Sequence, residues 1–380
     1  MKTHDFDFDL PESLIAQSPT PERGQSRLLV LNRGTGSREH RMVSELPMLL
    51  KKGTLLVFNN SRVRKARLFG VSINTGAKAE FLLIKKFDDL SWQVLAKRSK
   101  RKKSGTCYVF DDGTKAILSQ AARTREDPGP GTSSGEELLL CFDHPIDDDW
   151  LDRFGHVPLP PYIRREDTQA DSKRYQTIFA SQIGSAAAPT AGLHFTEKLL
   201  ADLDNAGMEK VFITLHVGLG TFLPVRTENI EDHVMHEETF YIGKEEAAKI
   251  EKAKKEKRNI LAVGTTSLRA LESVWQDGFL EAQRSHGAGK PEAKMAYRVK
   301  GLTSIFIYPG FKFKVVDQLF TNFHTPMSSL LMLVSAFTGE KSAPGRNSNI
   351  PGRDLILDTY HEAIKEGYRF FSYGDAMLIQ

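Results

Sequence analysis

The fold is decided by the stretch Asn259-Ile-Leu-Ala-Val-Gly-Thr-Thr-Ser-Leu-Arg-Ala-Leu271, in which an apolar run passes directly into a helical pattern. Asn259 to Val263 is short and apolar, as expected of a buried strand, and a new helix is predicted from Thr266 to Trp275. Gly264 lies at the junction. A strand that leads into a helix in this way is typical of an α/β layer architecture.

The segments on both sides continue this alternation after Gly155. Thr196 is a predicted helix N-cap and Gly207 the matching C-terminal stop. Helices are predicted over Thr196 to Gly207, Lys244 to Arg258, Ser328 to Phe337 and Leu355 to Gly367, and strands over Val211 to Val217, Thr303 to Tyr308 and Val315 to Phe323. Polar stretches around Ser285 to Lys294 and Glu340 to Arg353 are predicted loops.

The residues from Leu55 to Trp150 follow a different pattern. Short β-branched or aromatic runs are separated by turn residues with almost no helical periodicity, which predicts a small all-β barrel or sandwich. Ala121 to Glu136 is predicted to be a surface loop within it. The predicted fold class is therefore α/β, with a layered main domain over residues 1–55 and 154–380 and an inserted β domain over residues 56–153.

Composition limits the possible functions. The 380 residues are 40% apolar and carry 52 Lys and Arg against 48 Asp and Glu, a net charge of +4, so a polyanion must be met by a local patch. Cys107 and Cys141 lack CxxC spacing, which argues against a thiolate zinc site or an iron-sulfur cluster and favours a cytoplasmic location. The first residues do not resemble a signal peptide, and no run reaches the ~20 apolar residues of a membrane helix.

Polar clusters follow three predicted strands, at Thr214 to Thr221, Ala262 to Ser267 and Thr321 to His324. Ligands of open α/β sheets bind beyond the carboxyl ends of the strands, so these clusters predict a shared site. In the first cluster, Gly218 and Gly220 would let a ligand approach the backbone beside His216. The alternative is that His216 is a packed histidine with a hydrogen-bond partner.

The second cluster opens a predicted helix. Thr265, Thr266 and Arg269 would present amide groups, hydroxyls and a guanidinium to an anion such as a carboxylate or a phosphate. A capped helix with a surface arginine is the alternative. The chain has neither GxGxxG nor GxxxxGK[ST], so neither a Rossmann dinucleotide site nor a P-loop is indicated.

Two further patterns are ambiguous. A run of six cations could contact the phosphates of a nucleic acid or form a solvated face; it consists of Lys97, Arg98, Lys100, Arg101, Lys102 and Lys103. His233, His236 and Glu237 form HxxHE, and on a helix the two imidazoles would share one face. Because HExxH would be the stronger metal motif, no metal site is predicted.

Several longer motifs together resemble the S-adenosylmethionine:tRNA ribosyltransferase-isomerase family. They are Leu14-Ile-Ala-Gln17, Ser26-Arg-Leu-Leu29, Asn59-Asn-Ser-Arg-Val63, Ala66-Arg-Leu68, Leu159-Pro-Pro-Tyr-Ile163, Arg174-Tyr-Gln-Thr177, Ala187-Ala-Pro-Thr-Ala-Gly-Leu-His-Phe195, Thr214-Leu-His-Val-Gly-Leu-Gly-Thr-Phe222, Val263-Gly-Thr-Thr-Ser267, Ile305-Phe-Ile-Tyr-Pro-Gly310, Thr321-Asn-Phe-His324 and Tyr368-Arg-Phe-Phe-Ser-Tyr-Gly-Asp-Ala-Met377. The chain departs from the family pattern at Lys65, where proline is usual, and at Thr325-Pro-Met327, where Leu-Pro-Lys is usual.

The resemblance implies an α/β domain with an inserted β-barrel, acting as a monomer. It implies transfer and isomerisation of the ribosyl group of S-adenosylmethionine onto 7-aminomethyl-7-deazaguanine at the wobble position of tRNA. The products would be epoxyqueuosine tRNA, adenine and methionine. S-adenosylmethionine would be consumed as a substrate, and no cofactor is implied.

This chemistry suggests roles for the candidate residues. His194 and His216 are candidates for proton transfer, because imidazole titrates near neutrality. Thr265, Thr266 and Arg269 would hold a carboxylate or phosphate, Asn322 and His324 would contact base or ribose, and Glu237 or Asp375 would face the sulfonium. Arg62, Thr190, Gly218 and Gly220 complete the predicted substrate site. A non-catalytic tRNA-binding module and a metal-dependent hydrolase using HxxHE are the competing interpretations.

Overall fold

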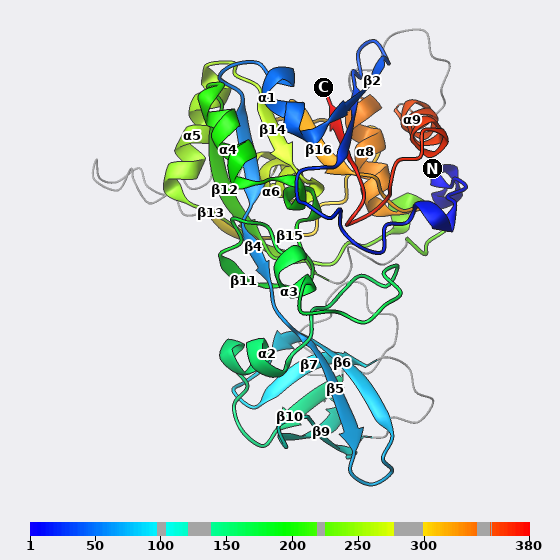
Figure 1. The fold of residues 1–380 in the computed structure, drawn as a ribbon, viewed down its shortest axis with the longest axis vertical. Coiled ribbons are helices and arrows are strands. Elements are labelled where there is room, and N and C mark those ends of the chain that lie inside the picture. The colour runs from blue at the N-terminus through cyan, green and yellow to red at the C-terminus, as the bar shows by residue number, and fades with distance from the viewer. Residues whose placement is uncertain (97–103, 121–137, 219–224, 277–298, 340–349, 351) are drawn as a thin grey trace.

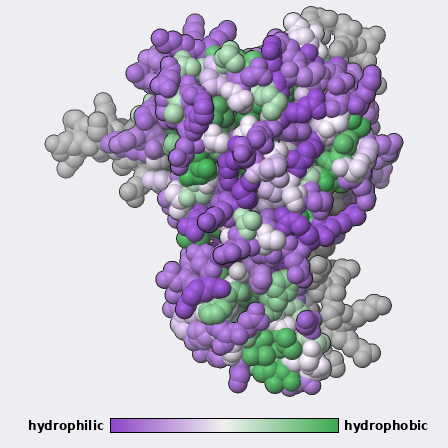
Figure 2. All heavy atoms as spheres, in the orientation of Figure 1, coloured by the Kyte–Doolittle hydropathy of each residue, from purple (hydrophilic) through white to green (hydrophobic). Residues whose placement is uncertain are grey.

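The computed structural model describes residues 1–96, 104–120, 138–218, 225–276, 299–339, 350 and 352–380 (Figure 1). These residues form a mixed sheet with helices on its faces and, at the other end of the molecule, a closed six-stranded barrel. The predicted α/β class with an additional small β-barrel is confirmed. The visible surface is mostly hydrophilic, with apolar residues gathered at the far end of the barrel (Figure 2).

The main sheet has nine strands in the order β15-β13-β12-β3-β14-β16-β17-β1-β2. Their bounds are β15 Val299–Thr303, β13 Glu238–Ile242, β12 Glu209–Leu215, β3 Leu55–Asn59, β14 Ile260–Val263, β16 Gln318–Asn322, β17 Ala376–Ile379, β1 Arg27–Leu31 and β2 Arg38–Met42. The four strands β12, β3, β14 and β16 run parallel. β1 pairs with β17, so the beginning of the chain joins the same sheet as its end.

Helices cover both faces of this sheet. They are α1 Leu46–Leu49, α4 Glu197–Asn205, α5 Lys244–Lys255, α6 Thr265–Gln276, α8 Ser329–Gly339 and α9 Arg353–Lys365, whereas α2 Asp148–Phe154 and α3 Asp171–Arg174 lie between the sheet and the barrel. Leu55 and Val57 of β3 belong to the same hydrophobic core as α5, α6, α8 and α9, while Leu56 and Phe58 belong to a second core with α1 and α4. The Thr196 side chain caps α4 as predicted, accepting a hydrogen bond from the Leu199 amide.

The barrel strands follow one another in the order β10-β7-β6-β5-β8-β9. They are β5 Arg67–Ser72, β6 Lys78–Lys86, β7 Ser91–Ala96, β8 Cys107–Val109, β9 Lys115–Gln120 and β10 Leu138–Phe142. Alternate side chains such as Leu68, Phe81 and Leu118 fill the interior. A short parallel pair, β4 Ser61–Val63 with β11 Gln182–Ser185, lies where the chain passes between barrel and sheet.

Two expectations about strand position are wrong, and a third is confirmed over a shorter range. The Leu55–Asn59 run belongs to the centre of the main sheet, and the barrel strands begin only at Arg67. β3 is buried on both faces and all but its last residue is apolar, whereas in the barrel strand Arg67–Ser72 buried residues alternate with more exposed ones. This difference in pattern distinguishes the sheet strand from the barrel strand. The strand predicted over Thr303 to Tyr308 ends at Thr303, and the one predicted from Val315 begins at Gln318.

Candidate functional site

A cavity lies at the carboxyl ends of β14 and β16, where the sequence predicts a site. Its lining comes from several segments that are distant in sequence: Tyr162, Ala187, Ala188, Pro189, Thr190, Ala191, Val217, Gly264, Thr265, Thr266, Thr321, Asn322, Phe323, His324, Thr325, Leu330, Phe371 and Ser372. Two of the three predicted polar clusters therefore supply much of this wall, and Val217 adds a contact from the first. The lining contains no Asp, Glu, Lys or Arg among the described residues.

The start of α6 forms one side of the cavity. Gly264 has φ +92°, a conformation that glycine adopts readily, and it turns the chain from β14 into the helix. Thr265 and Thr266 follow and are both buried. The Thr266 hydroxyl accepts a hydrogen bond from Nδ2 of Asn59 at 3.2 Å, which fixes this turn against β3. Amide groups in a first helical turn lack intrahelical partners, so this side of the cavity is suited to an anion.

Asn322 connects three segments beside the cavity. Its Oδ1 accepts a hydrogen bond from the Thr190 hydroxyl at 3.1 Å, and its Nδ2 donates to Nε2 of His194 at 3.0 Å. Nδ2 also lies 3.2 Å from the Phe371 carbonyl oxygen. These contacts fix the orientation of the Asn322 amide in the cavity wall.

His194 lies behind Asn322 and does not line this cavity. Because Nε2 accepts from Asn322, the neutral ring carries its proton on Nδ1, which donates to the Ser26 hydroxyl at 2.8 Å. Both ring nitrogens are thus occupied. The structure gives His194 a positioning contact with Asn322 and no direct contact with the cavity.

His324 is the imidazole that does line the cavity. Its Nε2 lies 2.9 Å from the Thr321 hydroxyl, and its backbone amide donates to the Tyr360 hydroxyl at 3.0 Å. Burial lowers the pKa of His324 to about 3, and burial together with the positive charges of Arg23 and Arg369 lowers the pKa of His194 to about 3. Both rings are therefore neutral at neutral pH.

These two histidines make stability depend on pH. The unfolded chain binds a proton at each imidazole below about pH 6.5, whereas the folded protein does so only near pH 3. The unfolded state thus binds more protons in this window, and the free energy of unfolding should fall as the pH decreases, by up to about 1.4 kcal/mol per pH unit for each ring. Urea unfolding between pH 7 and pH 4.5 would measure this slope for the wild type and for His324→Asn. In the variant, the free energy of unfolding should change less steeply with pH, because about one proton fewer is taken up on unfolding. Equal slopes in the two proteins would contradict the burial of a neutral His324.

Two aromatic residues, Tyr162 and Phe371, also line the cavity. The rings of Tyr162 and Phe371 lie with their centroids 4.7 Å apart, and the Tyr162 hydroxyl is 2.5 Å from that of Ser372. Phe371 has φ +72°, an unfavourable conformation for a residue with a bulky side chain. Such strain is common at binding sites, and aromatic faces attract cations.

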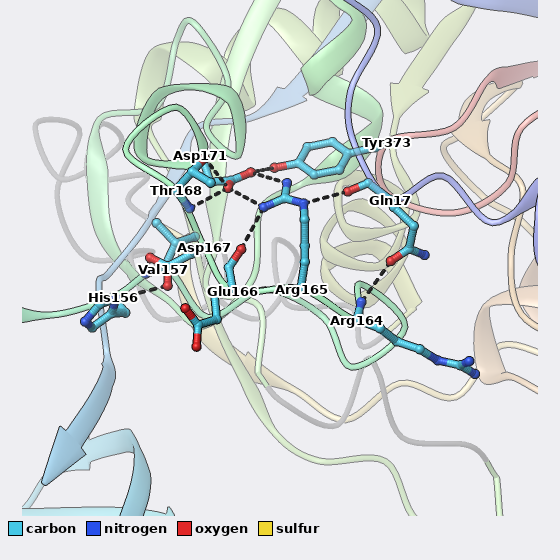
Figure 3. A network of polar contacts seen from close by, with 10 residues as sticks. All are labelled: Gln17, His156, Val157, Arg164, Arg165, Glu166, Asp167, Thr168, Asp171 and Tyr373. Atoms are coloured by element: carbon cyan, nitrogen blue, oxygen red, sulfur yellow. Dashed lines mark hydrogen bonds and ion pairs between the residues drawn. The ribbon is translucent and has the colours of Figure 1, made fainter.

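A network of ion pairs and hydrogen bonds holds residues 164–171, which follow Tyr162 in the sequence (Figure 3). Arg165 donates to both oxygens of Asp171, at 2.7 and 2.8 Å, and the Tyr373 hydroxyl donates to Oδ1 at 2.8 Å. Arg165 also donates to the Gln17 carbonyl oxygen at 3.0 Å. Burial alone would raise the pKa of Asp171, but the hydrogen bonds from Arg165, Thr168 and Tyr373 outweigh it and hold this pKa well below its ordinary value. The network joins the N-terminal segment, the segment after the barrel and the C-terminal turn.

The predicted charged residues do not line the cavity. Asp375 accepts hydrogen bonds from the backbone amides of Arg27 and Arg369, at 2.9 and 2.8 Å, so its carboxylate holds the C-terminal turn. Glu237 is exposed. Arg62 is also exposed and lies 3.7 Å from a carboxylate oxygen of Asp152.

Arg269 is buried and forms an ion pair with Glu238, so its guanidinium is not a surface group at the helix start. Glu238 also accepts a hydrogen bond from the Gly218 amide at 2.9 Å. The sequence alone did not lead us to predict a role for Glu238. Its signal was the period of two in β13, where Glu238, Phe240 and Ile242 share the buried face.

His216 follows β12 and points toward the short β4–β11 pair. Its Nδ1 is buried without a hydrogen-bond partner in the described part of the chain, and burial, followed by the charge of Arg64, lowers its pKa. Gly184 of β11 contacts the ring closely: a Cβ on Gly184 would lie 2.9 Å from its Cε1 and Nδ1 atoms. His216 is thus packed, as the alternative interpretation expected, but the hydrogen-bond partner that it also expected is not found at Nδ1. Its catalytic role stays a prediction.

This contact predicts that Gly184→Ala will displace the imidazole. We expect a loss of about 1–3 kcal/mol in the free energy of unfolding, because the added methyl group overpacks a confined ring and because Gly184 has φ +145°, which a residue with a Cβ rarely adopts. Gly310→Ala is the control, since Gly310 also has a positive φ, of +101°, but a Cβ there would meet no atom within 4 Å. Chemical denaturation of both variants would measure the difference, and similar stability would show that His216 can move at little cost.

The remaining predictions have mixed outcomes. Lys97, Arg98, Lys100, Arg101, Lys102, Lys103 and Gly220, together with the predicted loops at 121–136, 285–294 and most of 340–353, lie outside the described residues. The helical geometry assumed for HxxHE is wrong, because residues 233–237 form no helix. Among the described residues, no three His, Cys, Asp or Glu side chains converge as metal ligands would. Nor does any helix in these ranges have the length and apolar character needed to cross a membrane.

The two departures from the family pattern have clear structural settings. Lys65 extends toward α2, where its Nζ donates to the Asp152 carbonyl oxygen at 2.5 Å. Met327 has φ +52°, and its amide donates to the Phe6 carbonyl oxygen at 2.9 Å. Met327 itself does not line the cavity, although Thr325 does.

Comparison with known proteins gives matches along the whole chain. A family model described as a queuosine biosynthesis protein matches residues 3–379. Proteins named S-adenosylmethionine:tRNA ribosyltransferase-isomerase from Treponema denticola and Clostridioides difficile are 49% and 44% identical over 382 and 381 residues, with 100% of each chain covered. The crystal structure of S-adenosylmethionine tRNA ribosyltransferase from Thermotoga maritima is 32% identical, with a TM-score of 0.50 over 99% of this chain and 100% of that one. The chain therefore belongs to the queuosine biosynthesis family and is a transferase of the S-adenosylmethionine:tRNA ribosyltransferase-isomerase class.

Proposed function

We propose that this enzyme moves the ribosyl group of S-adenosylmethionine onto 7-aminomethyl-7-deazaguanine at the tRNA wobble position and isomerises it. The products are epoxyqueuosine tRNA, adenine and methionine. The observation that carries the proposal is the cavity itself, whose lining combines the start of α6 with the aromatic residues Tyr162 and Phe371 and contains no charged side chain among the described residues. The names of the relatives support the two substrates, and the precise base and products are part of the proposal.

The geometry suggests where each part of S-adenosylmethionine binds. The amide groups and hydroxyls at Thr265 and Thr266 would hold the methionine carboxylate. The rings of Tyr162 and Phe371 would lie near the sulfonium, since aromatic faces attract cations. Asn322, held in place by Thr190 and His194, would hydrogen-bond to adenine or ribose. Neutral imidazoles suit a cationic substrate because they do not repel it.

The reaction then requires proton transfer within the cavity. The amine of the modified base attacks C1′ and displaces adenine, which leaves with a proton. The sulfonium makes the C5′ protons acidic, so a base removes one, and the electron pair left on C5′ forms a bond to C1′ as the C1′–O4′ bond breaks. The freed oxygen on C4′ then attacks C5′ and displaces the sulfur, which closes the epoxide and releases methionine. We assign proton transfer in the cavity to His324, since a bound carboxylate nearby would raise its pKa toward the useful range. His194 acts through Asn322 as a positioning residue, and His216 remains a second candidate for proton transfer.

The enzyme would consume S-adenosylmethionine as a substrate and use no cofactor. We propose that it acts in the cytoplasm as a monomer. The run from Lys97 to Lys103 would add phosphate contacts to the anticodon arm.

Incubation with S-adenosylmethionine and precursor-modified tRNA, followed by assay of free adenine, tests this function. We expect adenine and modified tRNA in equal amounts. The matched control is the same tRNA with unmodified guanine, which lacks the attacking amine. Binding of tRNA without adenine release would instead favour a non-catalytic binding module.

A further inference from the structure

A second, smaller cavity lies beside the first and shares Ser372 with it. Unlike the first cavity, it is lined by two arginines, and its lining has no Asp or Glu among the described residues. The lining residues are Pro19, Thr20, Arg23, Gly24, Ser26, Arg174, Leu193, His194, Ser372, Tyr373 and Gly374. Neither the predicted substrate residues nor the proposed mechanism accounts for the two arginines.

Backbone carbonyl groups hold both guanidinium groups in place. Arg174 donates to the carbonyl oxygens of Pro21 and Thr20, at 3.0 and 2.8 Å. Arg23 donates through Nη2 to the Gln176 carbonyl oxygen at 2.9 Å, whereas its Nη1 is buried without a partner. Within the described ranges neither arginine forms an ion pair with a carboxylate. The two cations are thus fixed in position but not neutralised.

The electrostatic effect of this pair reaches its neighbours. Burial, and then the charge of Arg174, lowers the pKa of Arg23. The charges of Arg23 and Arg369 also contribute to the lowered pKa of His194. Two like charges held together in a partly buried cavity are costly unless an anion binds between them.

His194 separates the two cavities. Its Nδ1 donates to Ser26, which lines the second cavity, and its Nε2 accepts from Asn322, which lines the first. A group bound by Arg23 and Arg174 would therefore lie one side chain away from the proposed reaction site. The two cavities are therefore close enough to bind neighbouring parts of one substrate.

We propose that Arg23 and Arg174 bind a phosphodiester group of the tRNA backbone next to the modified nucleotide. Guanidinium groups match the geometry of phosphate oxygens and can donate two hydrogen bonds at once. The methionine carboxylate already has a site at the start of α6, which leaves the RNA phosphate as the anion for the second cavity. This inference rests on the proposed function, because it assumes that the wobble base enters the first cavity.

Methylphosphonate scanning combined with mutation tests the proposal. Each phosphate of the anticodon loop is replaced in turn by an uncharged methylphosphonate, and tRNA affinity is measured for the wild type and for Arg174→Gln. We expect one phosphate beside the modified nucleotide whose neutralisation weakens wild-type binding about tenfold but leaves the variant's affinity unchanged. The slope of log affinity against log salt should also fall by about 0.7 in the variant.

Arg258→Gln is the matched control. Arg258 also donates to a backbone carbonyl group, that of Gly53, but it pairs with Glu209 and precedes β14, at the opposite edge of the sheet from the cavity. We expect unchanged tRNA affinity and salt slope in this variant. Both variants are compared with the wild type by thermal unfolding, so that a general loss of structure is recognised.

Three results would overturn the inference. The first is a scan of the wild-type protein in which no phosphate beside the modified nucleotide affects binding. The second is an Arg174→Gln variant that is still sensitive to the same phosphate, and the third is an Arg174→Gln variant that loses affinity for S-adenosylmethionine instead of tRNA. If Arg174→Gln does not fold, the wild-type scan still decides between the first result and the expected one. A wild type that binds tRNA but releases no adenine would contradict the proposed function, while the binding scan would still test the phosphate site.

Discussion

Replacing Glu238 by glutamine is expected to destabilise the protein by about 3–5 kcal/mol, because it leaves the charge of Arg269 buried without a carboxylate. Both residues are only 4% or less exposed, and they form an ion pair between β13 and α6. Nη2 of Arg269 already lacks a hydrogen-bond partner among the described residues. Glutamine keeps the shape of the side chain but cannot compensate the guanidinium. Urea unfolding at neutral pH would measure the loss.

Glu237→Gln provides the matched control, since this neighbouring carboxylate is exposed. Its stability should stay within about 0.5 kcal/mol of the wild type, as is usual for surface substitutions. The double replacement Glu238→Gln with Arg269→Met removes both charges and should recover much of the loss. A Glu238→Gln variant as stable as the wild type would show that the buried charge is compensated in another way.

Replacing Asn322 by aspartate is expected to reduce kcat/KM for adenine release by about 10²–10³-fold, the effect of losing one oriented hydrogen-bond donor in an active site. The aspartate has nearly the same shape, but it cannot donate to His194 or to the Phe371 carbonyl oxygen as Nδ2 of Asn322 does. It would also add a negative charge beside His194 and raise the pKa of that imidazole. The adenine assay measures the first effect, and NMR titration of the His194 ring measures the second.

Asn205→Asp is the control for the same chemical change at an exposed site, at the end of α4. We expect normal adenine release from this variant. Near-normal kcat/KM in Asn322→Asp, with an unchanged His194 titration, would remove the Asn322 contacts from the proposed mechanism. A loss of activity together with unfolding would be detected by circular dichroism and would require Asn322→Ser as a smaller change.

The sequence predicted the elements of this fold well where a periodic pattern was long. The helix capped by Thr196 and the strand Ile260–Val263 followed by α6 lie where the patterns indicated. The Leu55–Asn59 run was misplaced because the next segments along the chain are β strands of the barrel, while its hydrogen-bonded partners are β12 and β14. Proximity in sequence was a poor guide to pairing there, since parallel strands need long connections.

The candidate site was predicted in part for a similar reason. Polar residues at strand ends indicated the correct edge of the sheet, because the carboxyl ends of parallel strands meet there. Thr265, Thr266, Asn322 and His324 accordingly line one cavity. The wall formed by Tyr162 and Phe371 had no local signal, as aromatic residues fill the core throughout this chain.

The sequence by itself determined which segments are strands and helices, where the polar strand ends lie and to which family the motifs point, because these depend on local periodicity and residue order. Only the tertiary structure decided the role of individual side chains. Asn322 meets His194 across 128 positions of the chain, and the Asp375 carboxylate binds an amide 348 positions away. Such contacts arise from sheet order and loop packing, which bring distant residues together, so no local pattern could show that Arg23 and Arg174 share a cavity or that Glu238 pairs with Arg269.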